Sequence, residues 1–145
     1  MIKRVYIVAT CIIALLFTSC KKSNVNATSL DGLQVEAEAI SGWCGSSFKV
    51  TVNKEKTEKQ SLKSNCQPDV DNHTKSYKTN ADLFKKLNDF ILSKALLDTN
   101  IQECARCLDG EDYLITIKNN DQINKLSIAN KEGEYKAFLD LIKQL

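Results

Sequence analysis

The chain has 145 residues, a length that allows one domain, and its 43% hydrophobic and 26% charged residues exclude a largely disordered protein. Its 20 basic and 18 acidic residues give a net charge of +2, whereas nucleic-acid-binding domains are usually strongly basic, so no nucleic-acid partner is expected. A single histidine argues against histidine-based catalysis and histidine-rich metal sites.

The first residues have the pattern of a secretory signal peptide. Lys3 and Arg4 precede an uncharged run, residues 5–17, that is shorter than the ~20 apolar residues of a membrane-spanning helix. The run ends in LFTSC, which closes with Cys20 and resembles a bacterial lipobox. In such a motif, small residues admit a peptidase and the cysteine receives diacylglycerol. The alternatives are an ordinary signal peptide and a short membrane anchor.

The resemblance implies a division of the chain. We expect residues 1–19 to be a lipoprotein signal peptide, residues 20–32 to be the lipidated Cys20 and a flexible tether, and residues 33–145 to form a single domain. Two or three acyl chains, including palmitate, would anchor the protein in a bacterial cell membrane or outer membrane, on the periplasmic side or at the cell surface. Residues 20–145 carry 18 basic and 18 acidic residues, so no polybasic patch remains.

Alternating polarity predicts strands in the first half of the domain. Residues 33–40 and 48–52 each have a period of two, which is typical of a half-buried strand. Residues 53–59 predict a polar turn, and residues 60–66 predict a third strand that returns antiparallel. Residues 68–78 are polar and predict a loop, of which only the end could be extended.

Helical spacing and capping residues mark two helices. Thr79 or Asn80 can cap a helix that is expected to end between Lys94 and Leu97. The acidic connection that follows, residues 98–112, contains a CxxC motif. Apolar residues at helical spacing in residues 135–145 predict a terminal helix.

Between this connection and the terminal helix, the sequence predicts a hairpin that begins with a strand over residues 113–117. A turn centred on Asn120 and Asp121 brings apolar residues opposite one another on one face: Ile115 faces Leu126, and Tyr113 faces Ile128. The order is strand-strand-strand-helix-strand-strand-helix. We therefore predict an α+β fold, an antiparallel sheet of about five strands with two helices on one face.

The residues GWCG at positions 42–45, followed by FKVTV at positions 48–52, resemble the start of a small uncharacterised domain of bacterial lipoproteins. That family also follows its opening strand with a glycine, cysteine and aromatic turn, and later has a helix, a hairpin and a closing helix. The resemblance covers most of residues 33–145. Because the family has no settled activity, it implies a fold and no functional residues.

Four cysteines remain in the predicted domain and allow three pairings in an oxidising compartment: Cys44, Cys66, Cys104 and Cys107. If the first hairpin turns at Glu55, Phe48 faces Leu62 and Cys44 faces Cys66. The sequence therefore predicts a cross-strand disulfide between Cys44 and Cys66, with Cys104 and Cys107 forming the other.

The motif Cys104-Ala105-Arg106-Cys107 has three interpretations. We predict a structural disulfide, and keep thiol-disulfide redox chemistry as the alternative because Arg106 could lower the pKa of a thiol. A metal site is not expected, since two cysteines do not complete a zinc site and His73 is distant in sequence.

No catalytic residues or cofactor are predicted. We expect a non-enzymatic binding, accessory or inhibitor-like module with an unknown protein or glycan partner. Trp43 is expected to pack at a corner of the sheet, with an exposed contact residue as the alternative. Residues 49–86 carry nine lysines and five acidic residues, which indicates a solvated face or an electrostatic docking surface.

The lipid anchor gives the first testable prediction. Cys20→Ser removes the thiol that would carry diacylglycerol, so the variant should lose acyl labelling and be released from the membrane. Metabolic labelling with a radioactive fatty acid, together with fractionation, measures both. Continued labelling of the variant would show that the lipid is attached elsewhere or that the motif is not a lipobox.

Overall fold

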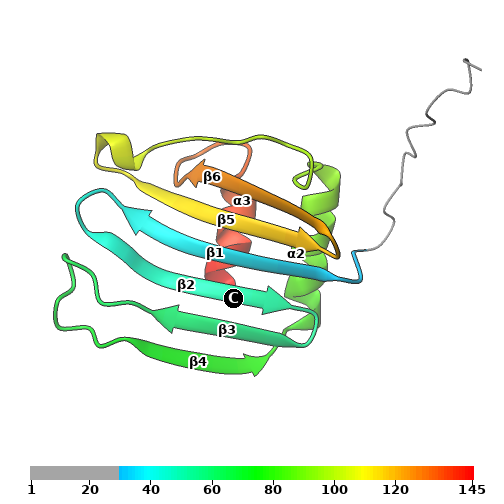
Figure 1. The fold of residues 1–145 in the computed structure, drawn as a ribbon, viewed down its shortest axis with the longest axis horizontal. Helices are drawn as coiled ribbons and strands as arrows, with labels where there is room; N and C mark the ends of the chain where they lie inside the picture. Colours follow the sequence, from blue (N-terminus) through cyan, green and yellow to red (C-terminus); the bar gives the residue numbers. More distant parts are fainter. Residues whose placement is uncertain (1–29) are drawn as a thin grey trace, which may run out of the picture.

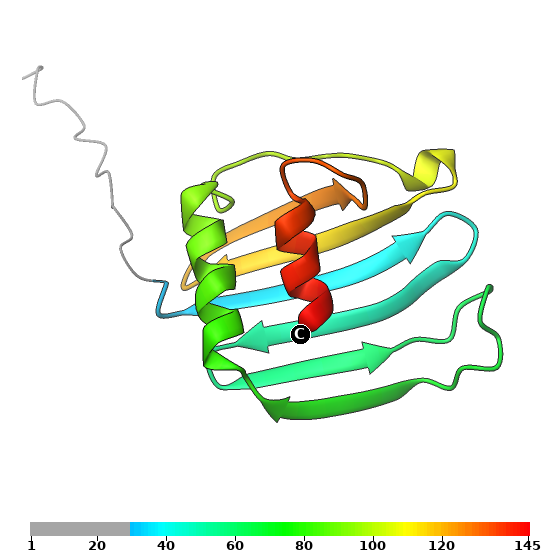
Figure 2. The ribbon, with the colours of Figure 1, turned by 180° about the vertical axis from the view of Figure 1, so that it is seen from behind.

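Six antiparallel strands form one sheet in the order β4-β3-β2-β1-β5-β6 in the computed structural model, which describes residues 30–145 (Figure 1). The strands are β1 (Leu33–Ser41), β2 (Gly45–Asn53), β3 (Lys56–Ser61), β4 (His73–Lys78), β5 (Glu111–Asn119) and β6 (Gln122–Ala129). The helices α2 (Ala81–Ser93) and α3 (Lys136–Gln144) lie on one face of the sheet (Figure 2), and a short 3₁₀ helix, η2 (Arg106–Leu108), precedes β5. The fold is α+β, with six strands rather than about five.

The core lies between the sheet and the two helices. Alternate residues of the central strand are fully buried there: Leu33, Val35, Ala37 and Ala39. They meet the inward residues of β5 and an apolar stripe on each helix, including Leu87, Ile91, Phe138, Leu139 and Ile142. The buried and less buried residues of β1 alternate with the same period of two as the apolar and polar residues of the sequence. The other face of the sheet is therefore directed toward solvent.

Helix α2 begins at a side-chain cap. The Asn80 Oδ1 atom accepts hydrogen bonds from the backbone N–H groups of Asp82 (3.0 Å) and Leu83 (3.1 Å). These bonds satisfy donors that a helix leaves unpaired at its first turn. The predicted helix start is confirmed, and α2 ends at Ser93, next to its C-cap Lys94.

The register of the β5–β6 hairpin is confirmed. Ile115 pairs with Leu126 and Tyr113 pairs with Ile128, with Asn120 in the turn at φ 52°. Asparagine tolerates this left-handed conformation better than most residues, which explains why a short turn forms here.

The predicted turn and third strand of the first hairpin were wrong. The Asn53 Oδ1 atom accepts from the backbone N–H groups of Glu55 (2.9 Å) and Lys56 (2.8 Å) and closes a tight turn. Strand β3 therefore starts at Lys56, and Phe48 pairs with Ser61 rather than with Leu62. Side-chain capping of the turn shortened the loop and shifted the register by one residue.

Strand β4 replaces most of the loop predicted over residues 68–78. It pairs with β3 from Ser61 opposite His73 to Lys56 opposite Lys78, and all its residues are exposed. A strand without a buried face has no hydrophobic alternation, so the sequence carries no periodic signal for it.

Leu30, which lies in the predicted tether, packs within the hydrophobic core. Its side chain is 4% exposed within the core, and its carbonyl accepts from the N–H of Leu33 (3.0 Å). The hydrophobic core therefore includes a residue on the N-terminal side of the predicted boundary at residue 33. The predicted signal peptide, the lipobox and Cys20 lie outside the described residues.

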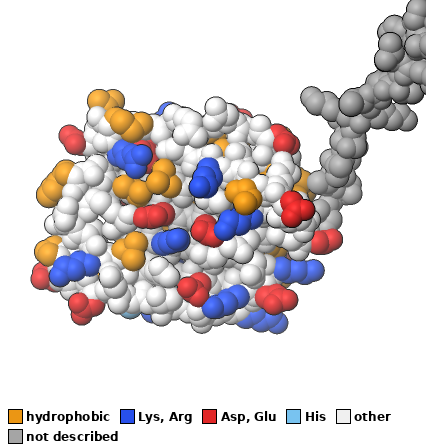
Figure 3. Space-filling view, viewed as in Figure 1, with side chains coloured by type: hydrophobic (Ala, Val, Ile, Leu, Met, Phe, Trp, Pro, Cys, Tyr) orange, Lys and Arg blue, Asp and Glu red, His pale blue; other side chains and the backbone are white. Residues whose placement is uncertain are grey.

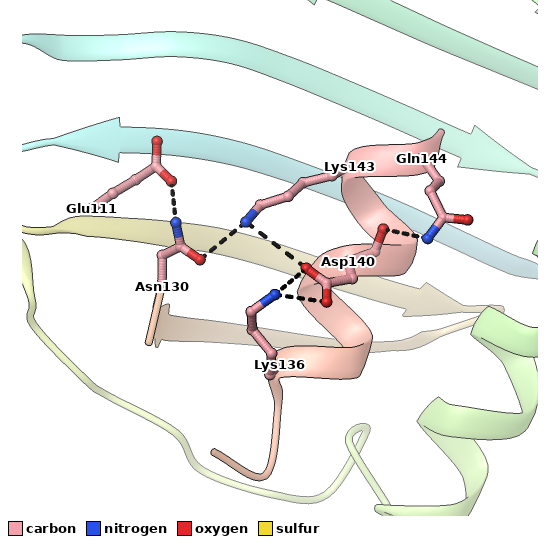
Figure 4. Close-up of polar contacts among 6 residues, drawn as sticks. All are labelled: Glu111, Asn130, Lys136, Asp140, Lys143 and Gln144. Carbon is pink, nitrogen blue, oxygen red and sulfur yellow. Dashed lines mark hydrogen bonds and ion pairs between the residues drawn. The ribbon is translucent and has the colours of Figure 1, made fainter. Parts of the chain in front are cut away.

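A polar network fastens α3 to the sheet (Figure 4). The Asn130 side chain donates to Glu111 Oε2 (2.8 Å) and accepts from Lys143 Nζ (3.0 Å). On the same helix, Lys136 Nζ donates to both carboxylate oxygens of Asp140 (2.6 and 2.7 Å). Lys143 Nζ also lies 5.5 Å from the centroid of the Tyr113 ring, and burial raises the pKa of that tyrosine. The network adds polar contacts to the apolar packing of Phe138, Leu139 and Ile142.

The role of Leu30 can be tested by a leucine-to-alanine pair. Leu30→Ala should lower the free energy of unfolding by about 2 kcal/mol, because it removes a buried side chain and leaves a cavity. Leu108→Ala should change it by less than about 0.5 kcal/mol, because Leu108 is 88% exposed. Urea denaturation of residues 20–145 measures both. If the Leu30→Ala and Leu108→Ala variants have equal free energies of unfolding, Leu30 does not lie in the core in solution.

Candidate functional site

The loops at one end of the sheet form a surface that we call the tip, defined by residues 42–44, 62–72 and 104–110. Strand β1 enters at the other end at Leu33 and reaches the tip at Ser41 (Figure 1). Nine extended residues cover roughly 25–30 Å. The tip therefore lies one full strand away from the point where residues 1–29 join the domain.

Cys44 and Cys66 are at disulfide distance in the tip, with their Cα atoms 5.0 Å apart. They are the pair that the sequence suggested, although the strand register used to derive it was wrong. Both cysteines lie beyond the ladder, where the N–H of Asn65 donates to the Cys44 carbonyl (2.9 Å). This loop geometry, rather than regular strand pairing, brings the two residues together.

Cys104 and Cys107 are also at disulfide distance, with their Cα atoms 5.5 Å apart, and Cys107 lies within η2. The fully buried carboxylate of Asp112 accepts from the backbone N–H of Ala105 (2.7 Å) and of Arg106 (3.3 Å). The Arg106 side chain adds an ion pair at 3.5 Å. Asp112 thus fixes the CxxC segment through two backbone hydrogen bonds and one ion pair.

The two cysteine loops pack against each other. The N–H of Gly42 donates to the Gly110 carbonyl (3.3 Å), and a Cβ at Gly42 would lie 3.5 Å from the Arg106 carbonyl oxygen. Within the second loop, a Cβ at Gly110 would lie only 2.7 Å from the Cβ of Ala105, so the fold of that loop requires glycine at this position. The tip is consequently one connected unit, in which Cys44 and Cys66 join two loops and Cys104 and Cys107 lie within the third.

Two large apolar side chains project from these loops. Trp43 is 72% exposed and Leu108 is 88% exposed. The expectation that Trp43 packs at a sheet corner was wrong, because Trp43 lies in the tight turn between β1 and β2, which ends at Gly45 with φ 76°, and its side chain is in solvent. No periodic pattern in the sequence marks Leu108 as exposed, so sequence reasoning missed it.

The chemistry around Cys104 and Cys107 favours a structural disulfide over an exchange centre. Backbone N–H groups near a thiolate can lower its pKa, but those of Ala105 and Arg106 already bond to Asp112. The Arg106 guanidinium, which the redox interpretation requires beside a thiolate, is instead paired with the Asp112 carboxylate at 3.5 Å. Exposure of both cysteines is the one feature consistent with exchange.

The open face of the sheet carries mixed charges that are largely paired (Figure 3). Glu36 lies 2.8 Å from Lys118 Nζ and 3.9 Å from Lys49 Nζ, and the hydrogen bond from Lys118 lowers its pKa. A hollow of about 330 Å³ over β1 and β5 includes this glutamate. Residues of β1, β2, β5 and β6, together with Gln102, line it, so no local motif predicts it. Both glutamates of the hollow have partners, since Glu36 pairs with lysines and Glu38 accepts a hydrogen bond from Ser46 Oγ.

Within residues 30–145, no three His, Cys, Asp or Glu side chains are grouped as a metal site would require, and His73 stands at the start of β4. None of the helices in this part of the chain is long and apolar enough to cross a bilayer. No protein-family model matches the chain, and no curated protein is significantly similar to it.

The two disulfides should differ in their contribution to stability. In the chain-entropy model, the Cys44–Cys66 bridge, with a sequence separation of 22, contributes about 3 kcal/mol, and the Cys104–Cys107 bridge, with a separation of 3, contributes about 2 kcal/mol. Paired serine variants and urea denaturation measure both. Peptide mapping of the non-reduced domain should recover these two pairs. A crossed pairing would contradict the loop geometry of the tip.

Proposed function

We propose that this protein is a lipid-anchored, extracytoplasmic and non-enzymatic binding module that engages a partner protein through its tip. The observation that carries the proposal is the exposure of Trp43 and Leu108 on two adjoining loops, one tied to a third loop by Cys44 and Cys66 and the other holding Cys104 and Cys107. Tryptophan is enriched among residues that dominate binding energy in protein interfaces.

The tip is suited to binding because its loops are constrained before a partner arrives. The cysteine pairs, the Asp112 hydrogen bonds and the contact of Gly42 with Gly110 limit the conformations of both loops. A surface that is ordered in advance loses less conformational entropy on association. The apolar side chains can therefore contribute more of their burial energy to affinity.

The direction of the chain supports an outward-facing tip. An anchor at Cys20 would join the domain through residues 21–29 at the end where β1 begins, whereas Trp43 and Leu108 lie at the end where β1 finishes. A tether of this kind leaves the apolar tip available to a partner on the side away from the lipid.

Thiol-disulfide exchange at Cys104 and Cys107 is the alternative function, and their exposure is the observation in its favour. It predicts an easily reduced bridge, whereas a structural bridge should have a potential below roughly −300 mV. Equilibration of the domain with glutathione buffers separates the two functions.

The tip can be tested by site-specific photo-crosslinking in the membranes of the source organism. A photoreactive residue at Leu108 should give a discrete protein adduct, and Trp43→Ser should reduce its yield at least about tenfold if Trp43 is an energetic anchor. The same residue at Ile123 is the matched control, because Ile123 is 58% exposed at the opposite end of the sheet.

Three results would contradict the proposal: no adduct at Leu108, equal adducts at Leu108 and Ile123, or an adduct that Trp43→Ser leaves unchanged. Trp43 is the only tryptophan in the chain, so its fluorescence reports on the tip alone. A blue shift with protein-free phosphatidylglycerol vesicles would instead identify a lipid surface as the occupant.

A further inference from the structure

The two edge strands of the sheet, β6 and β4, differ in whether another segment covers them. At β6, the N–H of Ser127 donates to the Ile101 carbonyl (2.9 Å), and the N–H of Glu103 donates to the Ser127 carbonyl (2.8 Å), so a loop covers this edge. At β4, no element of residues 30–145 lies on the outer side, and all six residues are exposed. One edge is closed and the other is open.

The open edge presents unpaired backbone groups. The N–H of Thr79 donates to the Glu55 carbonyl (3.1 Å), in register with the β3–β4 ladder. Hydrogen-bonded positions alternate in antiparallel pairs, so the backbone groups of Thr74, Ser76 and Lys78 point away from β3. Each offers one N–H and one C=O to an added strand.

The same edge carries opposed positive charges. In the β3–β4 ladder, Lys56 lies directly opposite Lys78, and Lys59 lies directly opposite Lys75. Like charges at directly opposed positions are destabilising. The ladder therefore retains two unfavourable pairs that a nearby anion would relieve.

Only the β3 members of these pairs have partners inside the domain. Lys56 Nζ lies 2.9 Å from Glu58 Oε2, and Lys59 Nζ donates to the Lys143 carbonyl (3.2 Å) at the end of α3. In the described part of the chain, Lys75 and Lys78 form no salt bridge. The uncompensated charges are thus on the open strand itself.

We propose that β4 binds an extended acidic peptide segment of a partner protein, which adds to the sheet as a further strand. Backbone hydrogen bonds to Thr74, Ser76 and Lys78 hold the segment, and its carboxylates neutralise Lys75 and Lys78. This surface is separate from Trp43 and Leu108, so it does not depend on binding at the tip.

The strand geometry specifies the spacing of the acidic residues. Lys75 and Lys78 are three positions apart, and strand side chains alternate between faces, so these lysines lie on opposite faces of the sheet. An added strand places a carboxylate directly opposite each lysine when its acidic residues are three positions apart. Acidic residues two positions apart share one face and meet one lysine.

A second copy of this chain does not fit the edge. Antiparallel pairing of two β4 strands through their outward backbone groups, centred on Ser76, places Lys78 opposite Thr74 and Lys75 opposite Tyr77, and brings four lysines together without an acidic residue on either strand. Such repulsion is a common protection of edge strands against self-association. The charge that excludes a copy favours an acidic strand.

The test uses residues 20–145 and fluorescein-labelled eight-residue peptides of threonine and valine that contain two glutamates. The peptide with glutamates three positions apart should bind several-fold more tightly than the peptide with glutamates two positions apart, measured by fluorescence anisotropy in low salt. Hydrogen exchange should slow at the amides of Thr74, Ser76 and Lys78.

Two variants separate backbone pairing from charge. Ser76→Pro removes an outward N–H and should weaken binding about tenfold, whereas Ser76→Ala keeps that N–H and should bind normally. Lys75→Gln with Lys78→Gln leaves the strand intact and should abolish the preference for glutamate spacing. Lys86→Gln with Lys125→Gln is the matched control, because these lysines are also exposed and form no salt bridge within residues 30–145.

Absence of binding at millimolar peptide would overturn the proposal and leave β4 as a protected edge only. Equal affinity for the two spacings, equal loss in the control lysine variant, or binding without protection of the β4 amides would also overturn it. Dimerisation of the domain through β4, seen by sedimentation, would assign the edge to a second copy instead.

Discussion

The pairing of β1 on both sides is the constraint on which the domain depends. Strand β1 bonds to β2 along one edge and to β5 along the other, and thereby joins a four-strand unit, β1 to β4, to the β5–β6 hairpin. Its inward side chains are fully buried under the helices, from Leu33 to Ala39. Loss of that alternation would separate the two halves of the sheet and open the core, whereas changes at β4 would leave the core covered.

The parts of the fold that have a buried face could be predicted from the sequence. Alternation identified β1, β2 and β5, helical spacing identified α2 and α3, and facing apolar residues gave the β5–β6 register. The errors lie where polar side chains decide the backbone. Asn53 closes the first hairpin one residue earlier than expected, and β4 forms by backbone pairing without burying a side chain. The hydrophobic periodicity of the sequence does not reveal either effect.

The cysteine pairs of the tip could be predicted from the sequence, but the packing of its loops could not. Cysteine count and approximate hairpin position suggested both pairs, and Cys44 with Cys66 tolerated the register error because both residues are in loops. The buried Asp112 hydrogen-bonds the CxxC segment, but nothing in the sequence distinguishes it from its neighbours. An acidic residue within an acidic connection is expected to be exposed to solvent. Only the long-range packing of Gly42 on Gly110 reveals that the two loops form one surface.

The tip and the β4 edge differ in the physics by which each would recognise a partner. The tip presents Trp43 and Leu108 on constrained loops, so its affinity would come from apolar burial and depend weakly on salt. The edge presents backbone groups with Lys75 and Lys78, so its affinity would fall as salt screens charge. Strand β4 begins at the tip with His73 and runs back toward the end where Leu30 enters. A partner with an apolar pocket and an adjoining acidic strand could therefore occupy both surfaces at once, and the second contact would form at a high effective concentration.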